Sequence, residues 1–238
     1  DPNTLAEDGS TSLSSAQVSP DGRFLAFGLN RGGSDWITWH VLDIDTGARL
    51  PDELHWSRFS TATWLPDSSG FLYNRYEQPA TGQELLQEAG PPEYCLHLLG
   101  RNQAEDQVVY SRPDDPRLSF HGQVSDDGRY LLLSITRGTD PQNQLWYRDL
   151  SAGPVGEFTP LFNDFSAEYR WLGNDGSQFW LQTDAGAERS RIVAVDVDQP
   201  DRLLEVVPEQ ELALEHALLL RDRLVTVHLR HASHVLTS

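Results

Sequence analysis

The protein has 238 residues, of which 38% are hydrophobic and 23 are Trp, Tyr or Phe, so its composition excludes an intrinsically disordered chain. Its length suffices for one large all-β domain or two small ones. The net charge of −18 disfavours nucleic acids and anionic membranes as partners, because like charges repel.

A motif of one turn and one strand recurs four times along the chain. Each copy has an Asp- or Asn-containing turn with glycine, followed by an aromatic and aliphatic run, at residues 19–27, 65–73, 125–133 and 173–181. The turn glycines Gly22, Gly70, Gly128 and Gly176 follow one another at intervals of 48, 58 and 48 residues. Glycine accepts the positive φ of a tight turn, and Phe, Tyr and Leu suit the strands around it. A fifth, degenerate copy is expected at residues 221–227.

A second family of strands follows each copy at a similar distance, at residues 36–43, 93–99, 144–150 and 189–196. Each then reaches a polar turn and resumes in another short strand, which gives about four strands per period. Four strands in about 45–50 residues are typical of a propeller blade. A β-sandwich would not need similar turns at a constant long period. The sequence therefore predicts an all-β fold of the β-propeller type.

The longest interval contains an insertion at residues 77–92 that is rich in Gln, Glu, Gly and Pro. This composition predicts a long loop at a blade edge. Four periods and a remnant fall short of a closed ring, and the chain ends inside a strand-like pattern. We therefore expect residues 1–238 to be part of a single propeller domain, incomplete, with about four to five four-stranded blades. Such a fragment would have an open sheet edge. The start of the chain has no Met and no signal-peptide pattern, so we expect it to come from a longer protein.

Motifs that carry catalysis or bind cofactors are absent from the sequence. It contains no Gly-x-Ser-x-Gly elbow, no His-Glu-x-x-His pair and no Walker loop, so we expect no catalytic residue, metal or cofactor in this chain. Its one cysteine, Cys95, lies in an apolar run and is expected to be a buried thiol without a disulfide. His228, His231 and His234 are spaced by three residues, but the strand pattern around His228 favours a surface accident over a metal site.

Several stretches resemble, in their order and spacing, the propeller of the prolyl oligopeptidases. The strongest match is SDDGRY at 125–130 followed by LWYRDL at 145–150, with Asp140-Pro141 between them. Other matching stretches are DPNTL at 1–5, SDW at 34–36, LPDEL at 50–54 and LFNDF at 161–165. The resemblance covers nearly the whole chain and weakens after about residue 205.

The resemblance implies a two-part enzyme, in which a seven-bladed propeller caps an α/β-hydrolase domain that carries Ser, Asp and His. The family cleaves short peptides after proline, and the propeller limits entry to the active site. This chain would supply roughly blades two to five, and the catalytic domain is absent from it. The partners implied are short proline-containing peptides and the α/β-hydrolase domain of the same parent chain.

The resemblance also implies roles for four residues. Phe59 matches an aromatic residue that lines the pocket beyond the proline site, Arg137 matches an arginine that faces the central cavity, and Thr139 lies on the same wall. Asp35 matches an acid that pairs with an arginine of the hydrolase domain, an interdomain contact. The alternatives are blade packing for Phe59, a solvated surface position for Arg137 and a turn cap for Asp35.

Three functions remain open on the sequence. The first is the substrate-gating propeller of a prolyl endopeptidase, and the second is a free-standing propeller that acts as a protein- or peptide-binding scaffold. The third is the propeller of an oligopeptidase with basic-residue specificity. Ser14 and Ser119 stand where animal prolyl oligopeptidases have Arg and Met, which leaves the outer subsites undefined. The single cysteine suits a cytoplasmic protein, and a removed signal peptide would allow a periplasmic one.

Overall fold

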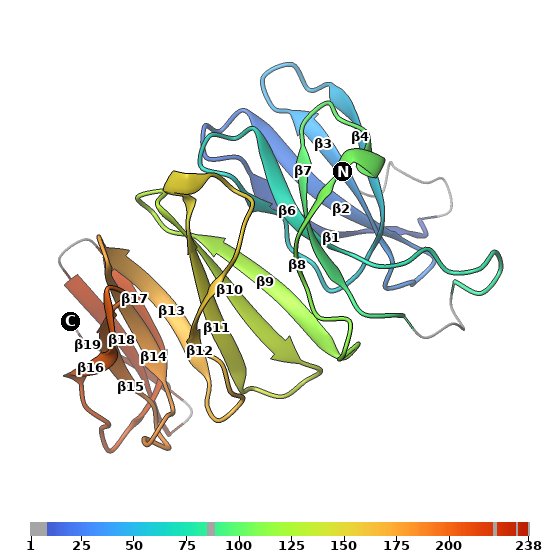
Figure 1. The fold of residues 1–238 in the computed structure, drawn as a ribbon. Helices are drawn as coiled ribbons and strands as arrows, with labels where there is room; N and C mark the ends of the chain where they lie inside the picture. Colours follow the sequence, from blue (N-terminus) through green and yellow to red (C-terminus); the bar gives the residue numbers. More distant parts are fainter. Residues whose placement is uncertain (1–8, 85–88, 221–222, 232, 238) are drawn as a thin grey trace.

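A computed structural model describes residues 9–84, 89–220, 223–231 and 233–237. In these residues the chain forms five antiparallel sheets, which follow one another in chain order (Figure 1). Each sheet is a meander in which strands adjacent in sequence are hydrogen-bonded neighbours. No helix among the described residues is long and apolar enough to cross a bilayer.

Among the described residues, the first four sheets have four strands each, and the fifth has three. The first sheet contains β1 (Thr11–Val18), β2 (Phe24–Arg31), β3 (Ile37–Asp43) and β4 (Arg49–Ser57). The second contains β5 (Thr63–Trp64), β6 (Gly70–Arg75), β7 (Glu93–Leu98) and β8 (Gln107–Ser111). The third contains β9 (Leu118–Val124), β10 (Tyr130–Arg137), β11 (Asn143–Asp149) and β12 (Thr159–Phe162). The fourth contains β13 (Tyr169–Asp175), β14 (Gln178–Thr183), β15 (Arg191–Asp196) and β16 (Gln199–Val207). The fifth contains β17 (Ala213–Leu220), β18 (Arg223–Arg230) and β19 (Ser233–Thr237), and two 3₁₀ turns lie at η2 (Gln103–Glu105) and η3 (Leu150–Ala152).

The recurring turn between the first two strands of a sheet is held by its own side chains. In the first sheet, Ser19 Oγ accepts the amide N–H of Phe24 at 2.9 Å and donates to Asp21 Oδ1 at 2.5 Å. The third sheet repeats this arrangement with Ser125 and Asp127, at 2.8 Å and 2.6 Å. Short polar side chains that bond neighbouring backbone groups favour such turns. This local chemistry explains why the motif was recognisable in the sequence.

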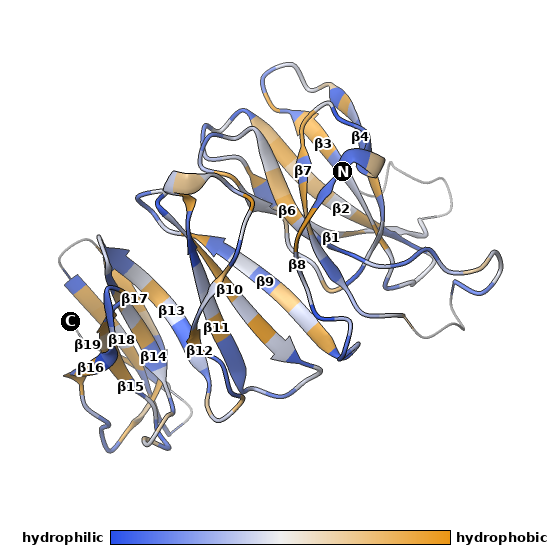
Figure 2. Ribbon diagram, viewed as in Figure 1, coloured by the Kyte–Doolittle hydropathy of each residue, from blue (hydrophilic) through white to orange (hydrophobic). Residues whose placement is uncertain are grey.

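The hydrophobic core lies between successive sheets, where both faces of a strand are buried. In β10, Leu131 and Leu133 pack toward the second sheet, whereas Tyr130 and Leu132 pack toward the fourth. This follows from the alternation of side chains along a strand. Hydrophobic residues fall mainly on the strands, and the turns are mostly hydrophilic (Figure 2). Each sheet therefore needs a neighbour on either side, as the blades of a propeller do.

The sequence-predicted elements agree with the structure, with two details to add. The insertion at 77–92 joins β6 to β7 as a loop, although residues 85–88 lie outside the described part. The fifth copy is confirmed as the start of β18, with 221–222 also undescribed. Residues 1–5, which contributed to the resemblance, lie outside the described residues as well.

Of the three histidines expected on the surface, His228 and His234 lie on two strands, and His231 is exposed in the turn after the first of them. His228 is buried in β18, where Nε2 lies 3.2 Å from Thr226 Oγ1, and His234 in β19 lies 2.9 Å from Glu215. The expectation of a surface position is therefore wrong for His228. Among the described residues, no group of three His, Cys, Asp or Glu side chains could hold a metal ion.

Candidate functional site

Consecutive turns of a meander lie at opposite ends of its strands, so alternate turns lie at the same end. The loops β2–β3, β6–β7 and β10–β11 therefore lie at the same end as the connections from β4 to β5, from β8 to β9 and from β12 to β13. Because each connection joins two sheets at this end, the end is shared by the whole row. We call the described residues of these six segments the loop face, namely 32–36, 58–62, 76–84 with 89–92, 112–117, 138–142 and 163–168. Phe59, Asp35 and Thr139 lie in it, and Arg137 lies at the adjoining end of β10.

A first cluster on the loop face forms around Arg58. Its guanidinium pairs with Asp35 Oδ2 at 2.9 Å, and its Cζ lies 4.9 Å from the Trp36 ring centroid and 5.1 Å from that of Phe59. A cation over aromatic faces is attracted by their negative π surfaces. Phe59 itself is 58% exposed, so it does not act as a blade-packing residue in this structure. Asp35 does not cap the turn, because Ser34 Oγ accepts the amide of Trp36.

A second cluster forms around Asp115 in the connection from β8 to β9. Asp115 accepts hydrogen bonds from Arg117 at 2.9 Å and from Arg137 at 3.2 Å. The hydrogen bond from Arg117, helped by the charges of both guanidinium groups, lowers the pKa of Asp115 to about 2. Arg137 also lies 4.1 Å from the ring centroid of Phe165, so it is held by partners and is not merely solvated. Thr139 is exposed in the adjoining turn.

The structure brings the four sequence-predicted residues together in two pairs. Arg58 joins Asp35 to Phe59, and the β10–β11 turn joins Arg137 to Thr139. A hollow of about 530 Å³ beside the second sheet is lined by Tyr76, Glu77, Pro91, Pro92 and Pro113 among others, but by none of the four predicted residues. The loop face thus offers the exposed ring of Phe59, prolines, and guanidinium groups that are already paired with Asp35 and Asp115. An apolar ring and paired charges suit a peptide better than a phosphate or a metal. The individual roles of the four residues stay predictions.

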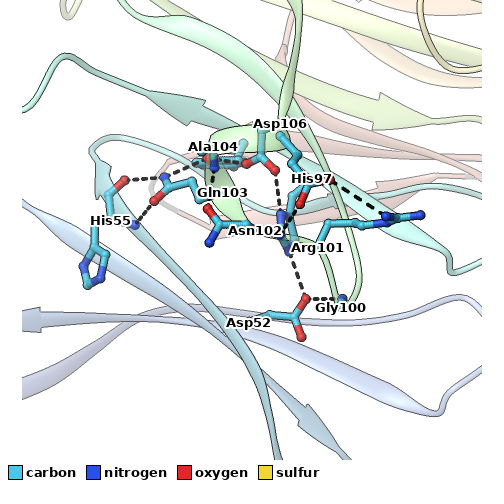
Figure 3. Close-up of polar contacts among 11 residues, drawn as sticks. Asp52, His55, His97, Gly100, Arg101, Asn102, Gln103, Ala104 and Asp106 are labelled. Carbon is cyan, nitrogen blue, oxygen red and sulfur yellow. Dashed lines mark hydrogen bonds and ion pairs between the residues drawn. The ribbon is translucent and has the colours of Figure 1, made fainter.

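A buried charged cluster lies elsewhere, between the first and second sheets, and sequence reasoning did not find it. His97 on β7 lies between two carboxylates, with Nε2 2.9 Å from Asp52 Oδ1 and Nδ1 2.7 Å from Asp106 Oδ1 (Figure 3). All three side chains are excluded from solvent. Burial alone would disfavour the charged imidazole, but the hydrogen bonds and charges of Asp106 and Asp52 raise the pKa of His97 to about 9. A histidine inside the apolar run at 94–99 was the one signal that the sequence offered.

The surroundings of this cluster favour a structural role. Tyr73 donates to Asp106 Oδ2 at 2.7 Å, and the amide of Gly100 donates to Asp52 Oδ1 at 2.6 Å. A histidine between two acids can move protons in an active site. Here no substrate can reach the ring, so the charged cluster ties the first sheet to the second.

The family comparison agrees with the architecture. The family model described as the prolyl oligopeptidase N-terminal β-propeller domain matches residues 1–238. The chain belongs to this family. The all-β propeller predicted from the sequence is therefore confirmed.

Relatives and solved structures cover nearly all of the chain. Prolyl oligopeptidase A of Amanita bisporigera is 33% identical over 97% of this chain and 33% of its own length. The prolyl endopeptidase of Elizabethkingia meningoseptica is 31% identical over 90% of this chain and 30% of its own length. Prolyl oligopeptidase B from Galerina marginata, solved with a 35mer hydrolysis and macrocyclization substrate, superimposes with a TM-score of 0.92. It is 28% identical and covers 99% of this chain and 35% of that structure. The chain thus spans about a third of the length of the relatives it matches.

Proposed function

We propose that this chain is the substrate-gating propeller of a serine endopeptidase that cleaves short peptides after proline. In this proposal the full-length protein carries an α/β-hydrolase domain that performs acyl transfer. The propeller would exclude folded proteins and contribute contacts to the outer part of the peptide, which adds specificity. The observation that carries the proposal is that Asp35, Phe59, Arg137 and Thr139 all belong to one end of the sheets.

The chemistry of the loop face supports contact with a peptide. Phe59 offers an exposed apolar ring, and Arg137 offers hydrogen-bond donors whose direction is fixed by Asp115. We propose Phe59, Arg137 and Thr139 as peptide contacts and Asp35 as the interdomain contact. The pairing of Asp35 with Arg58 would keep that carboxylate oriented on the loop face.

The position of cleavage tests the proposed function. The full-length protein is incubated with one unstructured peptide that contains a single proline and, well apart from it, an Arg-Arg pair, and the products are identified by mass spectrometry. The proposal predicts one cut, after the proline. The same segment placed in a rigid loop of a folded protein should stay uncut, because the propeller would deny it entry.

Other products would identify the alternatives. A cut after the arginines would indicate an oligopeptidase with basic-residue specificity. No cut at either site, with retention of the peptide by the propeller, would indicate a binding scaffold. A product lighter by one water than the expected linear fragment would indicate ring closure, since one relative from Galerina marginata is a dual function macrocyclase-peptidase.

A further inference from the structure

A buried asparagine connects the two clusters of the loop face. Asn74 lies on β6 and has no exposed surface. Its Nδ2 donates one hydrogen bond to the carbonyl of Phe59 at 3.1 Å and another to the carbonyl of Phe120 at 2.9 Å. Phe59 belongs to the connection between the first and second sheets, whereas Phe120 lies on β9 of the third. One carboxamide therefore links three consecutive parts of the propeller.

The backbone at Phe59 needs such support. Its φ is 46°, in the left-handed region that residues with a Cβ rarely adopt. The backbone N–H of Asn74 donates to Ser60 Oγ at 2.9 Å, so the residue after Phe59 is bound to Asn74 as well. Asn74 therefore binds both the carbonyl of Phe59 and the side chain of Ser60, and these two hydrogen bonds hold the strained conformation that directs the Phe59 ring outward.

The hydrogen bond from Asn74 Nδ2 to the Phe120 carbonyl links Asn74 to the strands that present Arg137. In the β9–β10 ladder Phe120 pairs with Ile135, and Leu118 pairs with Arg137. A sheet transmits position along its strands because its hydrogen bonds are short and numerous. The Phe120 carbonyl therefore lies on the same rigid element that presents Arg137.

The side chain of Asn74 uses its Nδ2 donors in hydrogen bonds but leaves its Oδ1 acceptor without one in the described part of the chain. Both Nδ2 hydrogen bonds are made, but Oδ1 is buried and has no partner among the described residues. A buried oxygen without a partner is unfavourable, so the orientation of this side chain is set by its two donor hydrogen bonds. Asn143, at the junction of the third and fourth sheets, uses both ends of its amide, since Oδ1 accepts from the Tyr169 amide at 2.7 Å and Nδ2 donates to the Tyr169 carbonyl at 3.0 Å.

We propose that Asn74 is a positioning residue that sets the spacing between Phe59 and Arg137, and thereby the preference for peptides long enough to reach both. This inference rests on the proposed function, in which those two residues contact the peptide. Among the unstructured peptides that the propeller would admit, it assigns to the loop face those with several residues on the N-terminal side of the proline, rather than those that end near it.

The test compares two substrates in the full-length protein. One is a short peptide that ends near the scissile proline, and the other carries several more residues on its N-terminal side. Phe59→Ala removes the contact itself and is expected to lower the ratio of kcat/KM for long over short peptide by about fivefold, the effect of losing one modest contact. Asn74→Ala is expected to lower the ratio to a similar extent, mainly through KM for the long peptide. The Asn74→Ala/Phe59→Ala double variant should be no worse than Phe59→Ala alone.

Asn143→Ala is the matched control, because it removes a buried asparagine at the next junction, between the third and fourth sheets, that has no hydrogen bond to the Phe59 segment. It should lower thermal stability but leave the ratio unchanged. If Asn74→Ala does not fold, Ser60→Ala removes only the hydroxyl that accepts the Asn74 amide and should lower the ratio in the same direction. An unchanged ratio in the folded Asn74 or Ser60 variant, with a lowered ratio in Phe59→Ala, would overturn the positioning role alone. An unchanged ratio in Phe59→Ala would instead overturn the proposed peptide contact, and the inference with it.

Discussion

The buried histidine between the first two sheets makes stability depend on pH in a defined direction. His97 is protonated between Asp52 and Asp106, and these carboxylates raise its pKa to about 9. An unfolded histidine has a pKa of about 6.5. A group whose pKa is raised by folding stabilises the folded state fully at a pH below its unfolded pKa. This stabilisation is lost as the pH rises through the folded pKa. The propeller should therefore lose stability between about pH 6.5 and pH 9.

The size of the effect follows from the two pKa values. A difference of about 2.5 pKa units corresponds to about 3 kcal/mol, at about 1.4 kcal/mol for each unit. His97→Gln removes the positive charge and leaves two buried carboxylates without it, which should cost about 3–5 kcal/mol near neutral pH. The variant should also lack the decline in stability between pH 6.5 and 9.

Denaturant unfolding of the propeller, followed at several pH values between 6 and 10, measures both effects. His55→Gln is the control, because His55 belongs to the same region but is exposed beside Glu53. It should keep the wild-type decline. A wild-type free energy of unfolding that stays constant from pH 6.5 to 9.5, or a decline that persists in His97→Gln, would refute the assignment of a charged His97.

Two further substitutions test contacts of the second and third sheets. Gly122→Ala should lower stability by about 2 kcal/mol, a typical cost of overpacking, because its Cβ would overlap Tyr94 Oη, which donates to Thr63 at 3.1 Å. Gly90→Ala, whose Cβ would meet open space, is the control, and equal melting temperatures for both variants would contradict this packing. Asp115→Asn should raise KM for extended peptides about fivefold, because Arg137 loses a charge-assisted hydrogen bond worth about 1 kcal/mol at a partly exposed site. An unchanged KM would show that Asp115 does not orient Arg137 for substrate.

The local parts of the fold could be predicted from the sequence because their causes are local. The turns around Gly22 and Gly128 depend on side chains two to five residues away, so each copy carries its own signal. Strand limits were predicted to within about two residues. The strand expected from Trp36 begins at Ile37 instead, because the Trp36 indole leaves the sheet and donates to the carbonyl of Glu84.

Contacts across sheets could not be predicted in this way. His97 and Asp52 are 45 residues apart, and Asp35 and Arg58 are 23 apart. Nothing in the residue types says which acid meets which base, because ion pairs depend on how the sheets stack. Asn74 was missed for the same reason, since its partner Phe120 lies 46 residues further along the chain. The resemblance supplied Phe59 and Arg137, and the structure adds the side chains that hold them.

The central claim is that the loop face, and not the opposite end of the sheets, meets the peptide. Cysteine protection tests it directly, because Cys95 is the only cysteine of this chain, and burial raises the pKa of its thiol to about 12. The test uses the full-length protein with its proposed serine nucleophile replaced by alanine. Thr139→Cys places a thiol on the loop face, and Asp126→Cys places one in the β9–β10 turn, at the other end of β10. Alkylation of each is followed with and without a saturating proline-containing peptide. Slower alkylation of Thr139→Cys alone is the predicted result, and slower alkylation of Asp126→Cys alone, or no change in either, would contradict the claim.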